Sequence, residues 1–318
     1  MKEIGGYFGL ELPSGDHFHT SALRLNSGRG ALEYIARSKN LKKVHVPIFT
    51  CSAIIEQLEK LGVEIKLYRI NESLEFEVQD FDKNDSIIYT NYFGLKNEFI
   101  RSISSKFNCL IIDNAQAFFA EPIVGIDTLY SPRKFFGVPD GGYLFTDNSL
   151  DIYLESDFSA SRADHLFERI DSNAMQGFEQ FLRNELAISN QPLKKMSNLT
   201  DSLLRSINYQ KARISRNENF NFFHKTLSNV NELANVIDIV TIDGPMVYPL
   251  LNRNGRLRET LIENNIFIPT YWPNVLDSTM PNDWEYYLSS KLVPLPVDQR
   301  YTLTDLDRVL SVVKSCLK

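Results

Sequence analysis

Short apolar runs recur through the first half of the chain, and amphipathic segments separate them. The apolar runs lie at residues 44–50, 64–70, 86–90, 109–112 and 143–146. Segments with the apolar spacing of a helix lie at residues 31–36, 51–61 and 98–107. Short apolar runs of this kind suit strands that are buried on both faces. Successive strand–helix–strand units with connections of this length predict an α/β protein with a parallel or mostly parallel sheet.

The pattern changes after residue 147. Residues 152 to about 223 look strongly helical and carry many charges. A separate α/β unit is expected from about residue 228, with strands at 236–242, 247–251 and 266–271 and helices at 253–264 and 303–317. We therefore expect a large domain over residues 1–225, which includes an irregular, Gly-rich N-terminal arm, and a smaller C-terminal domain over residues 226–318.

Composition narrows the class of protein. The 318 residues are 43% hydrophobic and 23% charged, which is ordinary for a globular protein, and the net charge of −6 argues against nucleic acid as the main partner. No stretch approaches the roughly 18 apolar residues of a membrane span, and the N-terminus lacks the apolar core of a signal peptide. Cys51, Cys109 and Cys316 are far apart without CxxC spacing. We expect reduced thiols in a cytoplasmic protein, and no metal site.

Candidate chemistry gathers around one strand end. Asp113 closes an apolar run, Gln116 follows it, and Lys134 comes 21 residues after Asp113 in a Ser-Pro-Arg-Lys segment. Ligands sit at strand ends in open α/β sheets. A Lys on a constrained loop near such an Asp is what a pyridoxal 5′-phosphate (PLP) site requires: the Lys forms a Schiff base with the aldehyde, and the Asp keeps the pyridine nitrogen protonated. Taken singly, the Asp is more often a cap or loop acceptor, and the Lys a solvated charge.

A second candidate element precedes the first expected helix. Ser27, Gly28, Arg29 and Gly30 form a small, Gly-containing turn that enters this helix. Free backbone N–H groups and the positive end of the helix dipole favour a phosphate at such a place. Ser27 alone could instead be only the N-cap of the helix.

These residues together resemble the DegT-type nucleotide-sugar aminotransferases, a family of fold-type I PLP-dependent enzymes. The family pattern is a strand ending in Asp, then two residues and a Gln or His, an aromatic-rich strand, a Lys, and a Gly pair after a six-residue gap. This sequence matches it at Asp113, Gln116, Tyr130, Lys134 and the pair Gly141-Gly142. The turn at residues 27–32 resembles the family's phosphate-binding element.

The resemblance implies a fold and roles for these residues. The fold would be a large domain with a mostly parallel, seven-stranded sheet flanked by helices, and a smaller C-terminal α/β domain. Lys134 would carry PLP and act as general acid and base. Asp113 would tune the ring, and Gln116 would hydrogen-bond the phenolic oxygen or support Asp113. The phosphate would lie against Ser27 and Gly28, and Arg29, which replaces a small residue of the family, would add charge there or point outward.

Two departures from the family concern the cofactor's surroundings. Cys51 stands where many members have an aromatic residue that stacks on the PLP ring, so either Cys51 covers the ring or a nearby aromatic does: Phe49, Tyr92 or Phe93. Asn91 stands at a common His position and can offer a hydrogen bond but no acid–base chemistry.

A third departure concerns the phosphate. The family has a Ser five residues before the Lys, and this chain has Leu129 there, so Thr128 or Ser131 would have to replace it. The family also supplies an Asn and an Arg from the neighbouring subunit. Asn190 and Lys195 are the nearest candidates for these in the present sequence.

The activity that the resemblance implies is transfer of an amino group from an amino acid, usually glutamate, to a nucleotide-linked keto-sugar, in surface polysaccharide biosynthesis. The protein would be a homodimer with a shared active site. Lys134 argues against the dehydratase branch of the family, which has His there. Two alternatives stay open: another PLP enzyme of this fold, such as a lyase or a non-sugar transaminase, and a non-enzymatic α/β binding protein in which Lys134 and Asp113 form a structural ion pair.

Overall fold

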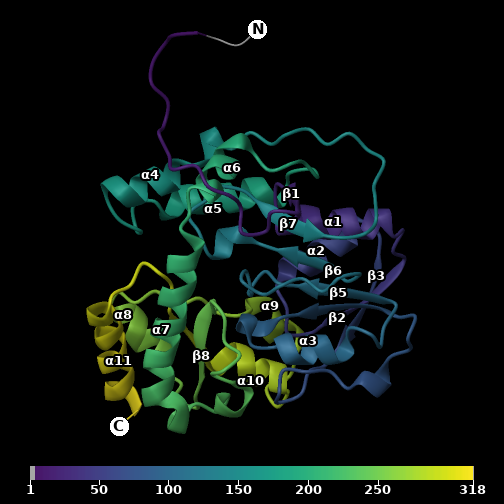
Figure 1. Cartoon of the computed structure of the whole chain (residues 1–318). Coiled ribbons are helices and arrows are strands. Elements are labelled where there is room, and N and C mark those ends of the chain that lie inside the picture. The colour runs from purple at the N-terminus through teal and green to yellow at the C-terminus, as the bar shows by residue number, and fades with distance from the viewer. Residues whose placement is uncertain (1–3, 318) are drawn as a thin grey trace.

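A seven-stranded sheet forms the centre of the computed structural model, which describes residues 4–317 (Figure 1). Its order is β1-β7-β6-β5-β4-β2-β3, and β7 alone runs antiparallel to its neighbours. The strands are β1 (Leu23–Leu25), β2 (Lys43–Pro47), β3 (Glu64–Tyr68), β4 (Ser86–Thr90), β5 (Cys109–Asp113), β6 (Asp127–Tyr130) and β7 (Gly142–Phe145). The prediction of an α/β fold with a mostly parallel, seven-stranded sheet is confirmed.

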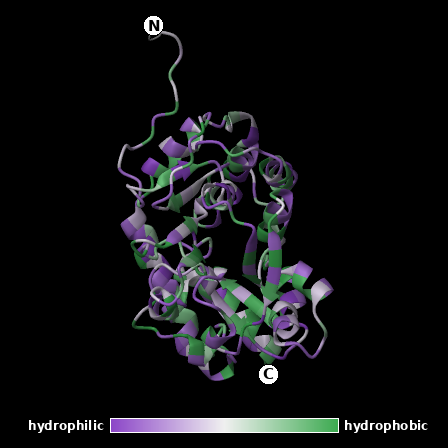
Figure 2. Cartoon of the chain, turned by 90° about the vertical axis from the view of Figure 1, so that its right-hand side faces the viewer, coloured by the Kyte–Doolittle hydropathy of each residue, from purple (hydrophilic) through white to green (hydrophobic). Residues whose placement is uncertain are grey.

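Helices cover both faces of this sheet, which explains why its strands read as continuous apolar runs. In β4, Ile87 and Tyr89 belong to the core that includes helix α3, whereas Ile88 between them belongs to the core under α1 and α2. Each fully buried side chain of this size contributes roughly 1.5–3 kcal/mol relative to exposure. Figure 2 shows the complementary pattern on the helices, which are banded in hydrophilic and hydrophobic colours. The first helices are α1 (Gly28–Ser38), α2 (Ser52–Lys60) and α3 (Asn97–Ile103).

The region after β7 is helical but discontinuous. Residues 152–159 form no helix, although the sequence predicted one from residue 152. The helices are α4 (Asp164–Asp171), α5 (Phe178–Ser189), α6 (Asn198–Arg205) and α7 (Tyr209–Leu227). The long helix α7 leads from the large sheet to the C-terminal part, where it packs on β8 and α11 (Figure 1).

The C-terminal part contains a two-stranded antiparallel sheet and a second core. Its elements are β8 (Val247–Leu251), α8 (Leu257–Glu263), α9 (Pro273–Ser278), α10 (Trp284–Lys291), β9 (Leu292–Pro296) and α11 (Leu303–Leu317). The predicted strand at 247–251 and the helix at 303–317 are confirmed. The helix predicted at 253–264 is confirmed in a shorter form. The division at residue 225 stays a prediction.

Two predicted strands are wrong. Residues 236–242 form a turn. The Asp238 side chain accepts the backbone N–H of Val240 at 3.0 Å, and the Val240 side chain is exposed. Residues 266–271 alternate like a strand, with Ile266 and Ile268 buried, but no neighbouring strand pairs with them. Instead the Arg258 guanidinium donates to the carbonyls of Ile268 and Pro269.

The N-terminal arm is irregular, as expected, and leaves the body of the molecule (Figure 1). The side chains of Tyr7 and Phe8 are 98% and 95% exposed, so this arm does not pack on the body of its own chain. Among residues 4–317 we find no helix whose length and apolarity would let it span a bilayer.

Candidate active site

The candidate residues meet at one edge of the sheet. β1, β4, β5 and β6 end at this edge, since Thr90 pairs with Asp113, Tyr130 with Tyr143 and Leu25 with Gly142. The loop that carries Lys134 and the start of α1 follow directly. The structure therefore brings Asp113, the lysine loop and the turn at Ser27-Gly28 together, as a site at the carboxyl ends of parallel strands requires.

Asp113 and Lys134 differ sharply in exposure. Asp113 is buried, and its Oδ1 accepts the Ala115 N–H at 2.8 Å. Burial raises the pKa of Asp113, while the charge of Lys134 and the Ala115 N–H act in the opposite direction. Lys134 is exposed, and no N–O distance within 4.0 Å joins it to Asp113. This geometry does not support a structural ion pair between the two side chains.

The lysine loop is held in place on both sides. A short helical turn, Pro132–Lys134, begins after β6, with the Lys134 N–H donating to the Ser131 carbonyl at 3.3 Å. Further on, the fully buried Asp140 accepts the backbone N–H of Ser197 at 2.9 Å and its hydroxyl at 2.6 Å, which fastens the loop to the start of α6. Sequence reasoning missed Asp140, because an Asp before two glycines reads as an ordinary turn residue.

The turn before α1 packs closely against its neighbours at the sheet edge. Ser27 is the N-cap, as its Oγ accepts the Gly30 N–H at 2.9 Å. A Cβ on Gly142 would lie 2.4 Å from the Ser27 carbonyl oxygen, so only glycine fits there. A Cβ on Gly30 would lie 2.8 Å from Asn26 Oδ1. Since Asn26 binds the 192–194 loop, this contact explains why the chain has Gly30 where the family has Ala.

Ser131 is the hydroxyl that lies beside this turn. A Cβ on Gly28 would be 3.9 Å from the Ser131 Cβ. Thr128 is the other residue considered for this position. It lies inside β6, is buried, and donates its hydroxyl to the Ile126 carbonyl at 3.1 Å. Of the two, Ser131 is therefore placed to help bind an anion at the start of α1.

Two arginines add positive charge near the turn. Arg29 lies within 3.7 Å of Glu56 on α2, and Arg133 pairs with Glu185 on α5. The pKa of Arg133 falls to about 10, mainly through burial and further through repulsion by Arg29. The Nε atoms of both side chains are buried without a partner among the described residues. Arg29 thus points towards α2 and still contributes to the local potential.

Gln116 offers a free donor close to Asp113. It is buried, and its Oε1 accepts the Phe93 N–H at 2.9 Å, which fixes Phe93 at a φ of 59°. Its Nε2 is buried without a partner among residues 4–317. Such an orphaned donor is costly unless a ligand satisfies it. Asn91, by contrast, donates to Asn97 and Asn114 at 2.8 and 2.9 Å and is committed to the protein.

The aromatic side chains considered as ring-stacking partners lie in the core. Phe49, Tyr92 and Phe93 are each fully buried, and the Tyr92 hydroxyl donates to the Phe49 carbonyl at 2.9 Å. None of them exposes a ring face. Cys51, at the N-cap of α2, is only partly buried. Of the four candidates, Cys51 is the one that can contact a ligand.

The two candidates for contacts to a neighbouring subunit lie on either side of the 192–194 loop. Asn190 is exposed and donates to the Leu186 carbonyl of its own helix at 3.1 Å. Lys195 is exposed and bridges through its backbone to Leu25 and Ser156. Both lie on the surface of a single chain, and their role stays a prediction.

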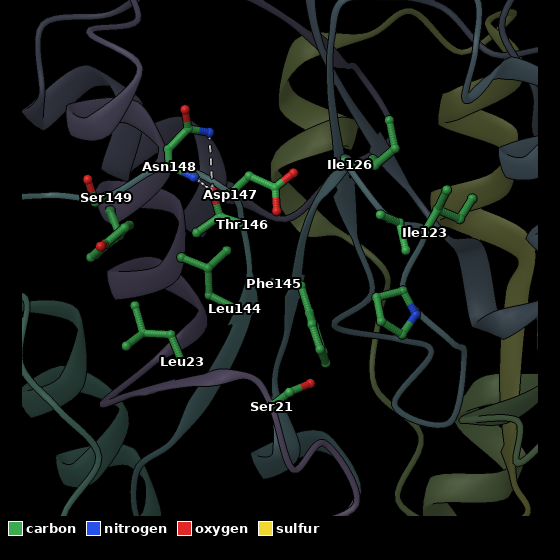
Figure 3. A pocket seen from close by; sticks show the side chains of 14 residues that line it. Ser21, Leu23, Ile123, Ile126, Leu144, Phe145, Thr146, Asp147, Asn148 and Ser149 are labelled. Atoms are coloured by element: carbon green, nitrogen blue, oxygen red, sulfur yellow. Dashed lines mark hydrogen bonds between the residues drawn. The ribbon is translucent and has the colours of Figure 1, made fainter.

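A cavity lies at the opposite edge of the sheet. It measures about 550 Å³ between the 122–126 loop and the segment after β7. Figure 3 shows Ile123 and Ile126 on one side, Thr146 to Ser149 on the other, and Phe145 between them. Its only ionisable lining side chains are those of Tyr34 and Asp147. This cavity therefore lacks the convergent acid, amine and anion-binding turn of the strand ends.

Comparison with known proteins identifies the fold. No protein-family model and no curated protein sequence matches this chain. A DegT/DnrJ/EryC1/StrS aminotransferase from Brucella abortus is similar in structure, with a TM-score of 0.63, 17% identity, and coverage of 92% of this chain and 85% of that one. DesI, solved with its TDP-sugar product, gives a TM-score of 0.65 at 15% identity over 93% of this chain and 80% of that one.

A third similar structure is NtdA from Bacillus subtilis with bound cofactor PMP, with a TM-score of 0.63 and 16% identity over 93% of this chain and 73% of that one. At such identities the likeness establishes the fold. The sequence resemblance to this group of aminotransferases is therefore confirmed in the fold, across nearly the whole chain.

Proposed function

We propose that this chain is a PLP-dependent aminotransferase that moves an amino group from an amino acid, with glutamate expected, to a nucleotide-linked keto-sugar. The observation that carries this proposal is that an exposed Lys134 lies near enough to the buried Asp113 for its charge to act on the pKa of that carboxyl, at the strand ends of this fold. The similar structures include aminotransferases solved with PMP and with a TDP-sugar product, which supports the cofactor and the substrate class.

The residues present fit PLP. Its phosphate would lie against Ser27, Gly28 and Ser131, where α1 supplies free N–H groups and Arg29 and Arg133 supply charge. Its phenolic oxygen would accept the orphaned Nε2 donor of Gln116. When bound, PLP supplies an electron sink for the substrate's α-carbon.

Lys134, Asp113 and Cys51 would each have a different role in this reaction. Lys134 would form the covalent link to PLP and, once displaced by the amino donor, would act as general acid and base that moves a proton from the substrate's α-carbon to the former aldehyde carbon of PLP, two bonds away across the nitrogen. Asp113 binds the protonated ring nitrogen, a cation that offsets the cost of keeping this carboxylate buried. Cys51 contacts the ring in place of an aromatic side chain.

The expected assembly is a cytoplasmic homodimer whose active site both subunits complete. Helices α4 and α5 pack on each other and expose apolar side chains more than half to solvent: Phe167, Ile170, Phe178 and Leu186. Exposed apolar side chains on two packed helices are the surface that we expect a second subunit to cover. Light scattering should give the mass of a dimer; a fully active monomer would contradict this part of the proposal.

The experiment is a visible absorption spectrum of the purified chain with PLP, followed by addition of glutamate. A yellow band that glutamate bleaches supports an aminotransferase. A band that glutamate leaves unchanged points to another donor or to another PLP enzyme of this fold, such as a lyase. Absence of any band would refute PLP chemistry and favour a binding protein. Conversion of a candidate keto-sugar nucleotide, followed by mass spectrometry, then tests the acceptor and the expected place in polysaccharide synthesis.

A further inference from the structure

Helix α7 carries a buried arginine that forms no ion pair with a carboxylate among the described residues. Arg216 is 1% exposed, and among the described residues no ion pair within 4.0 Å includes it. Burial lowers the pKa of Arg216 to about 10, and the nearby Asp298, which acts against this, is itself paired with Arg300 at 2.7 Å. Burying a cation without a carboxylate partner costs free energy of folding. We therefore expect the hydrogen bonds of Arg216 to hold the segments around it in one specific arrangement.

The donors of Arg216 join three segments that are far apart in the sequence. Nε donates to Gln299 Oε1 at 2.9 Å, just after β9. Nη1 donates to the carbonyls of Pro245 and Met246 at 3.0 and 3.3 Å, just before β8. Nη2 donates to the carbonyl of Phe135, in the lysine loop, at 3.2 Å. One side chain thus connects α7, the segments that flank both strands of the small sheet, and the loop of the candidate active site.

The contacts converge on the residue next to Lys134. Gln299 Nε2 also donates to the Phe135 carbonyl, at 3.1 Å, so two donors share this oxygen. The Arg216 guanidinium lies 4.5 Å from the centre of the Phe135 ring, in cation–π geometry. The Phe135 side chain and the peptide between Phe135 and Phe136 are therefore both fixed from the C-terminal part of the chain.

We propose that Arg216 and Gln299 are a pair of positioning residues, which hold the Lys134 backbone at the distance from Asp113 at which one bound cofactor reaches both residues, and which make that distance depend on the placement of the small sheet. This inference rests on the proposed function in one respect: Lys134 is the reacting amine. Displacement of a reacting group by about 1 Å costs roughly a hundredfold in rate, so an anchor directly beside Lys134 affects the reaction.

The first test needs no cofactor. Hydrogen–deuterium exchange of the full chain is measured for Arg216→Lys, which keeps the charge but loses the planar fork, and for Gln299→Leu. The matched control is Arg213→Gln, on the same helix, where the arginine pairs with Asp243 at the surface. We expect several-fold faster exchange across residues 131–138 in the first two variants, wild-type exchange in β4 and β5, and no change in the control.

The second test uses the protein loaded with PLP. We expect kcat for the glutamate half-reaction to fall by about tenfold in Arg216→Lys and Gln299→Leu, with KM for glutamate unchanged within about twofold. Wild-type exchange over residues 131–138 in a folded variant, faster exchange throughout the chain, or equal kcat would overturn the inference. Failure of PLP to attach to the wild-type chain would refute the proposed function, and the exchange result would still decide the positioning role. Should Arg216→Lys not fold, Gln299→Leu decides alone.

Discussion

The two edges of the seven-stranded sheet differ in what they offer a ligand. The edge at the β1, β4, β5 and β6 ends brings together an exposed amine, a buried acid and a helix N-terminus. The opposite edge holds a cavity of about 550 Å³, but its lining is mostly apolar or uncharged. Volume alone therefore does not locate the chemistry of this molecule; convergence of unlike polar groups from several strands does.

The difference has a cause in the topology. Parallel strands deliver their C-terminal residues to one edge, so Asp113 and the loop after β6 meet there although 21 positions separate Asp113 and Lys134. The opposite edge receives the β5–β6 loop and the start of the long segment after β7, which close over apolar side chains such as Ile123 and Phe145 (Figure 3).

The largest expected effect tests which edge carries the chemistry. Lys134→Ala removes the amine that forms the covalent link and moves the proton, so glutamate-dependent turnover should fall by about 10⁴-fold or more. The matched control at the opposite edge is Asp147→Asn, which should leave kcat and KM within about twofold of the wild type. Equal loss in both variants, measured by steady-state kinetics, would remove the distinction between the edges.

A smaller loss is expected from the acid at the same edge. Asp113→Asn keeps the shape of the side chain and an acceptor for the Ala115 N–H, but loses the charge that stabilises a protonated ring nitrogen. The variant should still take up PLP, with kcat reduced by roughly 10²–10³-fold. Single-turnover kinetics with glutamate separate this loss from weaker binding. A near-normal rate would rule out the role of Asp113.

Substitution of Gln116 tests whether its unpaired Nε2 donor binds the cofactor. Gln116→Glu keeps an oxygen for the Phe93 N–H and replaces the buried Nε2, which would bind the phenolic oxygen of PLP. We expect the apparent Kd for PLP to rise about tenfold, the scale of one hydrogen bond to a charged group. Fluorescence titration measures it. An unchanged Kd would mean that this donor does not face the cofactor.

The smallest effect concerns stability. The folded-state pKa of Asp113 is raised, so the folded chain holds this proton more tightly than the unfolded chain does. The stability of the cofactor-free protein should therefore fall as the pH rises above the ordinary Asp value of 3.8. Asp113→Asn should have a higher Tm than the wild type at pH 7. This difference in Tm should become smaller as the pH falls. Calorimetry without PLP that shows a constant gap or none would contradict this.

The sequence predicted well which residues meet at the carboxyl ends of the strands, because these residues follow from local patterns. Asp113, Lys134 and the turn at Ser27 each follow from short runs and their spacing along the chain. The strands of the C-terminal part were harder to predict from the sequence. Residues 266–271 alternate correctly for a strand, yet the carbonyl groups there are bound by Arg258 and by no neighbouring strand, a long-range contact that no local pattern reveals.

The same limit explains the residues that the sequence did not single out. Asp140 and Arg216 act through partners 57 and 81 positions away, Ser197 and Phe135 respectively. Nothing in the residues around them separates a buried anchor from a solvated charge. Cys51 is the converse case: the departure was visible in the sequence, and the burial of Phe49, Tyr92 and Phe93 favours Cys51 among the alternatives, but its contact with a cofactor stays a prediction.

The most direct test of the central claim is reductive trapping. The purified chain is incubated with PLP, reduced with borohydride and digested, and the modified peptide is identified by mass spectrometry. We predict a phosphopyridoxyl group on Lys134 at close to one per chain, prevented by prior reaction with glutamate. A label on another lysine, or no label on Lys134, would contradict the assignment of the active site to this edge of the sheet.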